Sequence, residues 1–161
     1  MTADIRFTAL AQEIGHDFSE IKIGGSYTPV VQDGCHLWVS GQIPRVGDEV
    51  LYLGVLGNSL NVQEGQKAAA ICTMRALALL QRVAGSLDDI ASILRITVYV
   101  RSAADFTQQS EVADGASDVL ARVLKQNGAH ARTSIGVLQL PKGASVELDV
   151  VATIKNIEPS H

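Results

Sequence analysis

Residues 61–100 read NVQEGQKAAAICTMRALALLQRVAGSLDDIASILRITVYV, and this stretch decides the fold class because it joins a helix to a buried strand. Asn61 and Glu64 have the spacing of a capping box, in which each side chain satisfies a backbone amide of the first helical turn. One apolar stripe then recurs at helical spacing: Ala68, Ile71, Cys72, Ala76, Leu79, Leu80 and Val83. The pattern predicts a helix that begins after Asn61, lies on a sheet and ends at Gly85.

The segments that follow predict a second strand–helix pair. Residues 93–100 alternate as a strand does, which places Leu94, Ile96, Val98 and Val100 on one buried face. A helix is predicted over residues 104–126, with the apolar stripe Phe106, Val112, Ala116, Val119, Leu120, Val123 and Leu124. Gly115 inside this helix costs about 1 kcal/mol relative to Ala, which indicates close packing at that point.

Short strands are predicted at both ends of the chain. Residues 27–32 and 35–40 flank an Asp-Gly turn, and residues 132–138 and 145–154 are joined by QLPKGA, a plausible hairpin loop. No linker, charge run or internal repeat divides the chain. The sequence therefore predicts a single α+β domain over residues 1–161, with two helices packed on one face of a mixed sheet.

The second face of that sheet is predicted to lack a helical cover. Ile135, Val137 and Val151 fall on the polar side of their strands. An apolar surface of this kind meets either water or another subunit, and association of several copies is the favoured outcome.

Composition argues against several classes of function. The net charge is −4, and no Lys/Arg cluster offers the basic surface that nucleic-acid binding requires. No segment has the length of a signal-peptide core or of a membrane span. Cys35 and Cys72 lie apart in hydrophobic segments, which is typical of buried thiols rather than of a disulfide. We therefore expect a soluble, cytoplasmic protein.

Arg132 is the residue whose placement indicates chemistry. The chain holds no P-loop, G-x-S-x-G, H-E-x-x-H or C-x-x-C motif, and its four histidines lack the spacing of metal ligands, so no metal site is predicted. Arg132 stands where the second helix gives way to an apolar strand. A guanidinium there can grip a small carboxylate through two parallel hydrogen bonds. A structural ion pair is the alternative, and the position alone leaves both open.

Glu147 is the acid that would form such an ion pair, because it lies on the polar face of the last strand. In a tight hairpin Glu147 falls opposite Gly136, which leaves Arg132 roughly 13 Å further along the strands. A direct contact within one chain is then disfavoured, and a ligand has room between them. Residues 40–44, SGQIP, are either a simple turn or a place where Gly41 lets the backbone approach a ligand.

Three stretches together resemble the RidA/YjgF family. They are residues 25–31 (GSYTPVV), residues 38–44 (WVSGQIP), and residues 131–137 (ARTSIGV) with the following LP and residues 146–152 (VELDVVA). The resemblance covers nearly all of the chain. It implies a chorismate-mutase-like α+β fold, a homotrimer with three clefts between subunits, and no metal or organic cofactor.

The resemblance also implies an activity and a set of site residues. Arg132 would clamp the substrate carboxylate, and Glu147 would position or activate the attacking water. Tyr27, Ser40 and Gly41 would line the pocket. The implied reaction is hydrolytic deamination of reactive enamine or imine acids, such as 2-aminoacrylate, to 2-keto acids and ammonia. Such imines are already electrophilic, so holding the carboxylate and orienting a water suffices.

Two pocket positions differ from those of the best-known members. Ser134 stands where they have Cys, and Asp114 where they have Asn; a carboxylate at that position would repel the substrate carboxylate. A non-catalytic trimeric module that binds small carboxylate metabolites is therefore the alternative function. Endoribonuclease activity is a third, and the acidic net charge argues against it.

Overall fold

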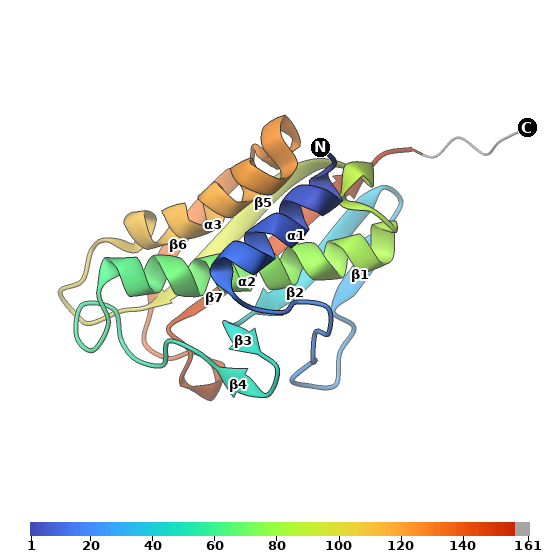
Figure 1. The fold of residues 1–161 in the computed structure, drawn as a ribbon. Helices are drawn as coiled ribbons and strands as arrows, with labels where there is room; N and C mark the ends of the chain where they lie inside the picture. Colours follow the sequence, from blue (N-terminus) through green and yellow to red (C-terminus); the bar gives the residue numbers. More distant parts are fainter. Residues whose placement is uncertain (157–161) are drawn as a thin grey trace, which may run out of the picture.

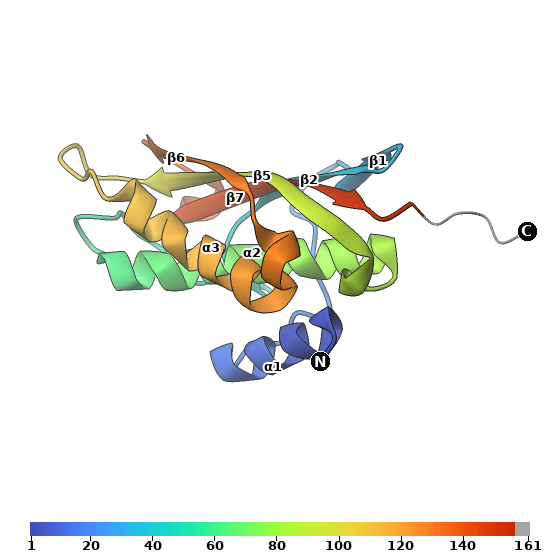
Figure 2. The same cartoon turned by 90° about the horizontal axis from the view of Figure 1, so that it is seen from above.

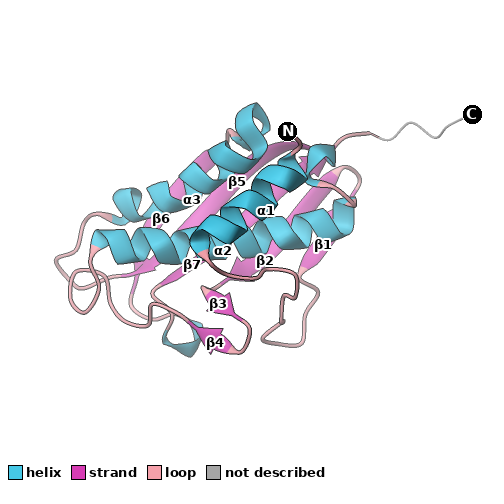
Figure 3. Cartoon of the chain, in the orientation of Figure 1, coloured by secondary structure: helices cyan, strands magenta, loops and turns pink. Residues whose placement is uncertain are grey.

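A five-stranded mixed sheet forms the centre of the protein (Figures 1 and 3). The computed structural model describes residues 1–156, so His161, the last of the four histidines, lies outside the described residues. The strands follow one another across the sheet in the order β1 (Val30–Asp33), β2 (His36–Gln42), β7 (Val146–Ile154), β5 (Ile90–Arg101) and β6 (Ala131–Val137). A two-stranded ribbon of β3 (Arg45–Val46) and β4 (Glu49–Val50) stands beside it.

Three helices lie on one side of the sheet. The predicted pair, α2 (Val62–Ala84) and α3 (Gln109–Leu124), packs directly on it, which confirms the α+β class. A third helix, α1 (Ala3–Ile14), was not predicted and lies on the outer side of the first two, so that the molecule has three layers (Figure 2). Short 3₁₀ turns complete the chain: η1 (Leu87–Asp89), η2 (Lys125–Gly128) and η3 (Pro141–Gly143).

Local signals in the sequence set the ends of α2. The capping box is formed, with the Glu64 amide donating to Asn61 Oδ1 at 2.9 Å and the Asn61 amide donating to Glu64 Oε1 at 3.2 Å. The helix ends at Gly85, as predicted. Val83, assigned to the buried stripe, is instead 43% exposed at the last turn.

The buried face of β5 differs from the prediction at one residue. Ile93, Ile96, Val98 and Val100 are buried, whereas Leu94 is 41% exposed. A register shift against β7 between residues 93 and 95 explains the difference, because it turns Ile93 inward and Leu94 outward.

The predicted hairpin of the last two strands is wrong. β6 pairs in parallel with β5, while β7 lies between β2 and β5 and is antiparallel to both. The connection therefore crosses the end of β5, and η3 lies within it. β7 buries alternate residues under α2, which favours the centre of the sheet over its edge.

Hydrogen bonds at its first turn hold α1 in place. Asp4 accepts from Gln81 Nε2 at 2.7 Å, from Ser86 Oγ at 2.6 Å and from the Leu87 amide at 2.9 Å. Burial by itself raises the pKa of Asp4, but these three donors lower it below the usual value. Their contribution to stability is present above the pKa of the unfolded chain and is lost as the pH falls through the folded pKa.

The open face of the sheet carries exposed apolar side chains. No helix of residues 1–156 covers this face (Figure 2). Trp38 is 53% exposed, Val31 52% and Ile135 45%, and Val151 is half-buried beside Trp38. Monomeric proteins rarely leave such a group of large apolar residues uncovered.

Two further expectations concern the thiols and the membrane. Within residues 1–156 both cysteines are free; Cys72 is buried as predicted, whereas Cys35 is only partly buried. No helix of this part of the chain combines the length and the apolar character needed to cross a bilayer.

The crossing of α2 and α3 depends on Gly115. A Cβ atom added there would lie 2.3 Å from the Gln66 carbonyl oxygen, which belongs to the backbone and cannot move aside. Gly115→Ala should therefore destabilise the fold by about 1–3 kcal/mol through overpacking, although helix propensity alone favours Ala.

Urea unfolding followed by circular dichroism measures this change, and Ala121→Gly at an exposed position of α3 is the control. The control should also lose stability, by about 1 kcal/mol, because it makes the reverse exchange without a close contact. A more stable Gly115→Ala variant would show that the two helices do not approach so closely.

Candidate active site

A pocket of about 360 Å³ opens beside the end of β2. It lies between the first residues of β7, the η3 turn and the middle of α2. The pocket brings together four of the seven predicted site residues, Tyr27, Ser40, Gly41 and Glu147. The other lining residues are Lys22, Ile23, Gly24, Gln42, Ile43, Arg45, Arg75, Pro141 and Lys142.

Gly41 makes room for the Glu147 carboxylate. The pairing of β2 with β7 is interrupted between Val39 and Gln42, so Ser40 and Gly41 bulge from the ladder. A Cβ atom on Gly41 would lie 2.3 Å from Glu147 Oε1. The glycine is therefore required by close approach to the Glu147 side chain, a reason that neither interpretation of residues 40–44 contained.

The Glu147 carboxyl group is more basic than an ordinary one. Burial raises its pKa, and the negative charge of Asp149 on the same strand face raises it further. Asp149 accepts a hydrogen bond from the Tyr99 hydroxyl at 3.0 Å. A carboxylate with a raised pKa inside a pocket is suited to accept a proton from water or from a bound ligand.

Gln42 holds Ser40 at the pocket wall. Its Nε2 donates to the Ser40 carbonyl at 3.1 Å and lies 3.3 Å from the Ser40 hydroxyl. Its Oε1 in turn accepts from Arg75 Nε at 3.2 Å. Tyr27 stands at the rim with 51% of its surface exposed, where its phenol can meet a ligand.

Arg75 is a pocket residue that the motifs did not indicate. It is only 4% exposed, and it also donates to the Arg45 carbonyl at 2.9 Å and the Lys22 carbonyl at 3.1 Å. A signal was present in the sequence, because Arg75 lies three residues after Cys72 and four before Leu79, on the buried stripe of α2. A charged residue on such a stripe needs buried partners.

Arg132, Ser134 and Asp114 do not reach this pocket. Arg132 pairs across β5 with Ile96 and Ser134 with Val98, both of which face the helices. Glu147 is paired with Tyr99, the residue between the buried Val98 and Val100, and therefore faces the other way. Within one chain, Arg132 and Glu147 lie on opposite faces of the sheet. The separation expected from a hairpin register is therefore wrong.

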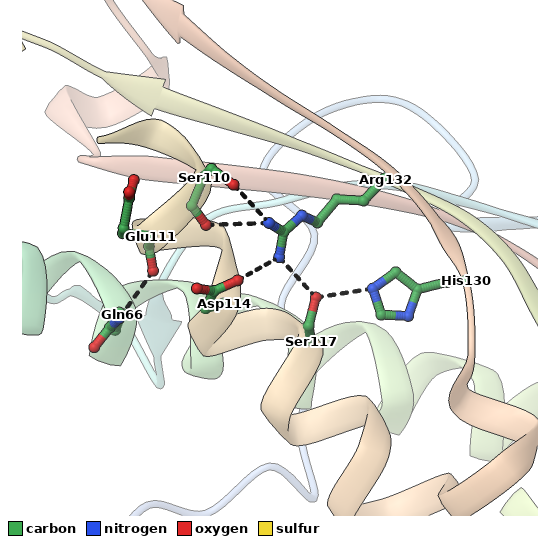
Figure 4. A network of polar contacts seen from close by, with 7 residues as sticks. All are labelled: Gln66, Ser110, Glu111, Asp114, Ser117, His130 and Arg132. Carbon is green, nitrogen blue, oxygen red and sulfur yellow. Dashed lines mark hydrogen bonds and ion pairs between the residues drawn. The ribbon is translucent and has the colours of Figure 1, made fainter. Parts of the chain in front are cut away.

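Arg132 is held against α3 by four hydrogen bonds (Figure 4). Its Nη1 donates to Asp114 Oδ1 at 2.9 Å and to Ser117 Oγ at 3.0 Å. Its Nη2 donates to the Ser110 hydroxyl at 2.9 Å and to the Ser110 carbonyl at 3.2 Å. The ion pair that the sequence left open is thus present, with Asp114 and not with Glu147. The Arg132 side chain is still 20% exposed.

His130 extends this network behind Ser117 (Figure 4). Its Nδ1 lies 2.7 Å from the Gly128 carbonyl, which can only accept, so Nδ1 carries a proton. In the neutral ring Nε2 then accepts from the Ser117 hydroxyl at 2.8 Å. Because the Ser117 hydroxyl donates to His130, its oxygen lone pairs accept from Arg132 Nη1. The series of hydrogen bonds from His130 through Ser117 therefore helps to orient the guanidinium.

Metal-binding side chains do not gather in the part of the chain that the structure describes. No group of three or more His, Cys, Asp or Glu residues there could hold a metal ion. The pocket instead offers one acid, one serine hydroxyl, one phenol and several cations.

Comparison with known proteins places the chain in a family. Residues 9–154 match the family model described as "YjgF/chorismate_mutase-like, putative endoribonuclease", a span that covers every strand and both sheet-packing helices. The chain belongs to the RidA/YjgF family. The predicted resemblance is confirmed, and so is the chorismate-mutase-like fold.

Individual relatives within the RidA/YjgF family cover most of the chain. Protein TCP17 of Trypanosoma cruzi is 41% identical over 132 residues, which are 81% of this chain and 82% of that protein. The crystal structure of Atu1372 from Agrobacterium tumefaciens, of unknown function, is 30% identical with a TM-score of 0.84, covering 96% of this chain and 94% of its own. A crystal structure from Shewanella oneidensis, described as "a putative endoribonuclease", is 27% identical with a TM-score of 0.87, covering 96% of this chain and 100% of its own.

The raised pKa of Glu147 can be tested by NMR titration of its side-chain carboxyl carbon. We expect Glu147 to titrate above the usual glutamate value, and Asp149→Asn to bring it only part of the way back, because burial remains. Because the pKa of Glu147 is higher in the folded than in the unfolded chain, ionisation of Glu147 opposes folding. Its contribution to the free energy of unfolding is fully present below the unfolded pKa and is lost as the pH rises through the folded pKa. Glu147→Gln should accordingly raise the melting temperature at neutral pH. A Glu147 pKa at or below the usual value would contradict the described burial.

Proposed function

We propose that the chain is a cytoplasmic hydrolase that deaminates reactive enamine or imine acids to 2-keto acids and ammonia. The observation that carries the proposal is the half-buried Glu147 carboxylate, with its raised pKa, in a pocket lined by Ser40 and Tyr27. Hydrolysis of an imine needs one group that takes a proton from water and then returns it to nitrogen. Glu147 is the one acid among the lining residues.

The proposed reaction is balanced with water as the only co-reactant. Glu147 takes a proton from a water whose oxygen bonds to the imine carbon, while the C=N electron pair moves to nitrogen. The protonated Glu147 then gives its proton to that nitrogen. The new hydroxyl then passes its proton to nitrogen through Glu147 as the C=O bond forms, and the C–N bond breaks so that ammonia leaves. An enamine enters the same route after its carbon takes up a proton and its nitrogen releases one, which gives the imine.

The proposed carboxylate clamp, Arg132, comes from a second copy of the chain. Arg132 and Ser134 lie on β6, the edge strand of the sheet, where a neighbouring molecule can approach. The open face with Trp38, Val31 and Ile135 offers the apolar surface for that contact. We therefore place β6 of one subunit beside the pocket of the next in a homotrimer, which accounts for the exposed edge strand and for the open apolar face. In this arrangement Arg132 of one subunit can act with Glu147 of another, although the two lie on opposite faces of the sheet within one chain.

A non-catalytic carboxylate-binding module is the second candidate, and Asp114 is the observation that favours it. Asp114 occupies one edge of the Arg132 guanidinium, so a substrate carboxylate has to compete with it or displace it. This competition for Arg132 would fit a pocket that binds carboxylate ligands weakly and catalyses no reaction. Ligand-dependent stabilisation without any acceleration of imine hydrolysis distinguishes this candidate.

Mixing of two inactive variants tests the proposed activity together with the shared site. Imines are generated by an amino-acid oxidase, and ammonia release is followed over the uncatalysed rate. Arg132→Ala and Glu147→Gln should each lose at least about a hundredfold of the activity. After unfolding and refolding together in equal amounts, they should recover about a quarter of wild-type activity, because that fraction of sites pairs an intact Arg132 with an intact Glu147.

Each variant refolded alone is the control for this mixing, and light scattering reports the number of subunits. No recovery from a correctly assembled mixture would place both residues in one subunit. No acceleration by the wild-type protein with any amino-acid imine would remove the proposed activity and leave the binding module.

Asp114→Asn should improve substrate capture. Removal of the negative charge frees Arg132 from an ion pair whose acid is 62% exposed, so KM for an imine acid should fall by about three- to tenfold with little change in kcat. Asp118→Asn, an exposed acid one turn further along α3, is the matched control and should leave KM unchanged. An increase in KM for Asp114→Asn would mean that Asp114 orients Arg132 rather than competes with the substrate.

A further inference from the structure

The pocket carries positive charge that the described chain does not neutralise. Four cations line it, of which Lys22 is paired with the exposed Asp48. The other ion pairs of residues 1–156 are Arg122 with Glu13 and Arg132 with Asp114. Among the described residues, Arg45, Arg75 and Lys142 therefore have no carboxylate within 4.0 Å. Besides Lys22, the positive charge of Arg45 is nevertheless near enough to Asp48 to contribute to the lowered pKa of Asp48.

Arg75 donates its hydrogen bonds to uncharged acceptors. Its guanidinium donates to the side-chain oxygen of Gln42 and to the backbone carbonyls of Lys22 and Arg45. These hydrogen bonds satisfy its N–H donors, but none of the acceptors carries a negative charge that would neutralise the guanidinium. The residue is 4% exposed, and water cannot screen it as it would at the surface. Glu147 does not compensate this charge, because a carboxylate paired with a guanidinium has a lowered pKa and that of Glu147 is raised.

Arg45 adds a donor that has no acceptor. Its Nε is buried and makes no hydrogen bond in the described structure, while its own carbonyl accepts from Arg75. Both arginines line the pocket, and besides burial the charge of Arg45 contributes to lowering the pKa of Arg75, so the two form one positively charged wall. Lys142 lines the pocket from η3. Because this Nε has almost no accessible surface, a ligand in the pocket would meet the outer guanidinium nitrogens of Arg45. An anionic group there forms charge-assisted hydrogen bonds beside the buried charge of Arg75.

We propose that this wall binds a second carboxylate of the substrate, so that the pocket prefers short dicarboxylic ligands over monocarboxylic ones. Arg45 would donate to this group, the buried charge of Arg75 would attract it, and Lys142 would close over it. The inference rests on the proposed function, in which Arg132 of a neighbouring copy holds the carboxylate next to the reacting carbon. The preferred substrate is then the imine of a dicarboxylic amino acid.

Calorimetric binding of two product-like acids tests the wall without requiring turnover. The probes are 2-oxoglutarate and 2-oxopentanoate, which have equal chain lengths and differ in a terminal carboxylate or methyl group. The wild-type protein should bind 2-oxoglutarate at least about tenfold more tightly, and this preference should shrink as salt is raised. Arg45→Gln should bring the ratio of the two affinities close to one. Arg82→Gln, which removes an exposed arginine of α2 outside the pocket, should keep the ratio.

Turnover of the matching imines, made from glutamate and from norvaline by oxidases, separates this inference from the proposed function. Turnover of both imines at equal efficiency, together with equal binding of both probes, would overturn the carboxylate wall and leave the deaminase. A preference for 2-oxoglutarate without any turnover would support the wall and remove the deaminase. If Arg45→Gln does not fold, the salt dependence of the wild-type preference decides, because a preference that does not change with salt contradicts an ionic contact.

Discussion

The central position of β7 is the constraint on which the rest of the structure depends. β7 forms hydrogen bonds with β2 on one side and with β5 on the other, and its buried residues lie under α2. This position brings Glu147 beside the bulge at Gly41, where the pocket opens. It also leaves β6 at the edge of the sheet, so Arg132 cannot meet Glu147 within one chain. The proposed need for a second copy follows directly from this strand order.

The pocket is the place where burial and charge oppose each other. The core around it is apolar and closely packed, with Leu37, Leu148 and Val146 fully buried. Against this background Arg75 is buried without a counter-ion and Glu147 has a raised pKa. Both features lower the stability of the fold, and proteins retain such destabilising groups at sites that bind ligands or transfer protons. The opposite design is seen at Arg132, where Asp114 and three further acceptors satisfy the side chain.

Patterns confined to one element were predictable. The capping box of Asn61 and Glu64, the end of α2 at Gly85 and the close approach at Gly115 each depend on contacts of the element itself or on one missing side chain. The predictions that were wrong depend on contacts between segments that are distant in the sequence. The bulge in β5 places Leu94 at the surface, and the sequence did not predict α1, whose short buried face of Ala3, Phe7 and Leu10 packs only once the other helices are in place.

The sequence by itself determined the α+β class and the family, because hydrophobic period, caps and short motifs are local properties of the chain. Only the tertiary structure decided which residues share a pocket. The order of strands is set by pairing between distant segments, so a loop that resembles a hairpin turn instead crosses β5. The resulting pairing puts Arg132 and Glu147 on opposite faces of the sheet. The packing of α2 makes Arg75, a charged residue on its buried stripe, part of the pocket wall.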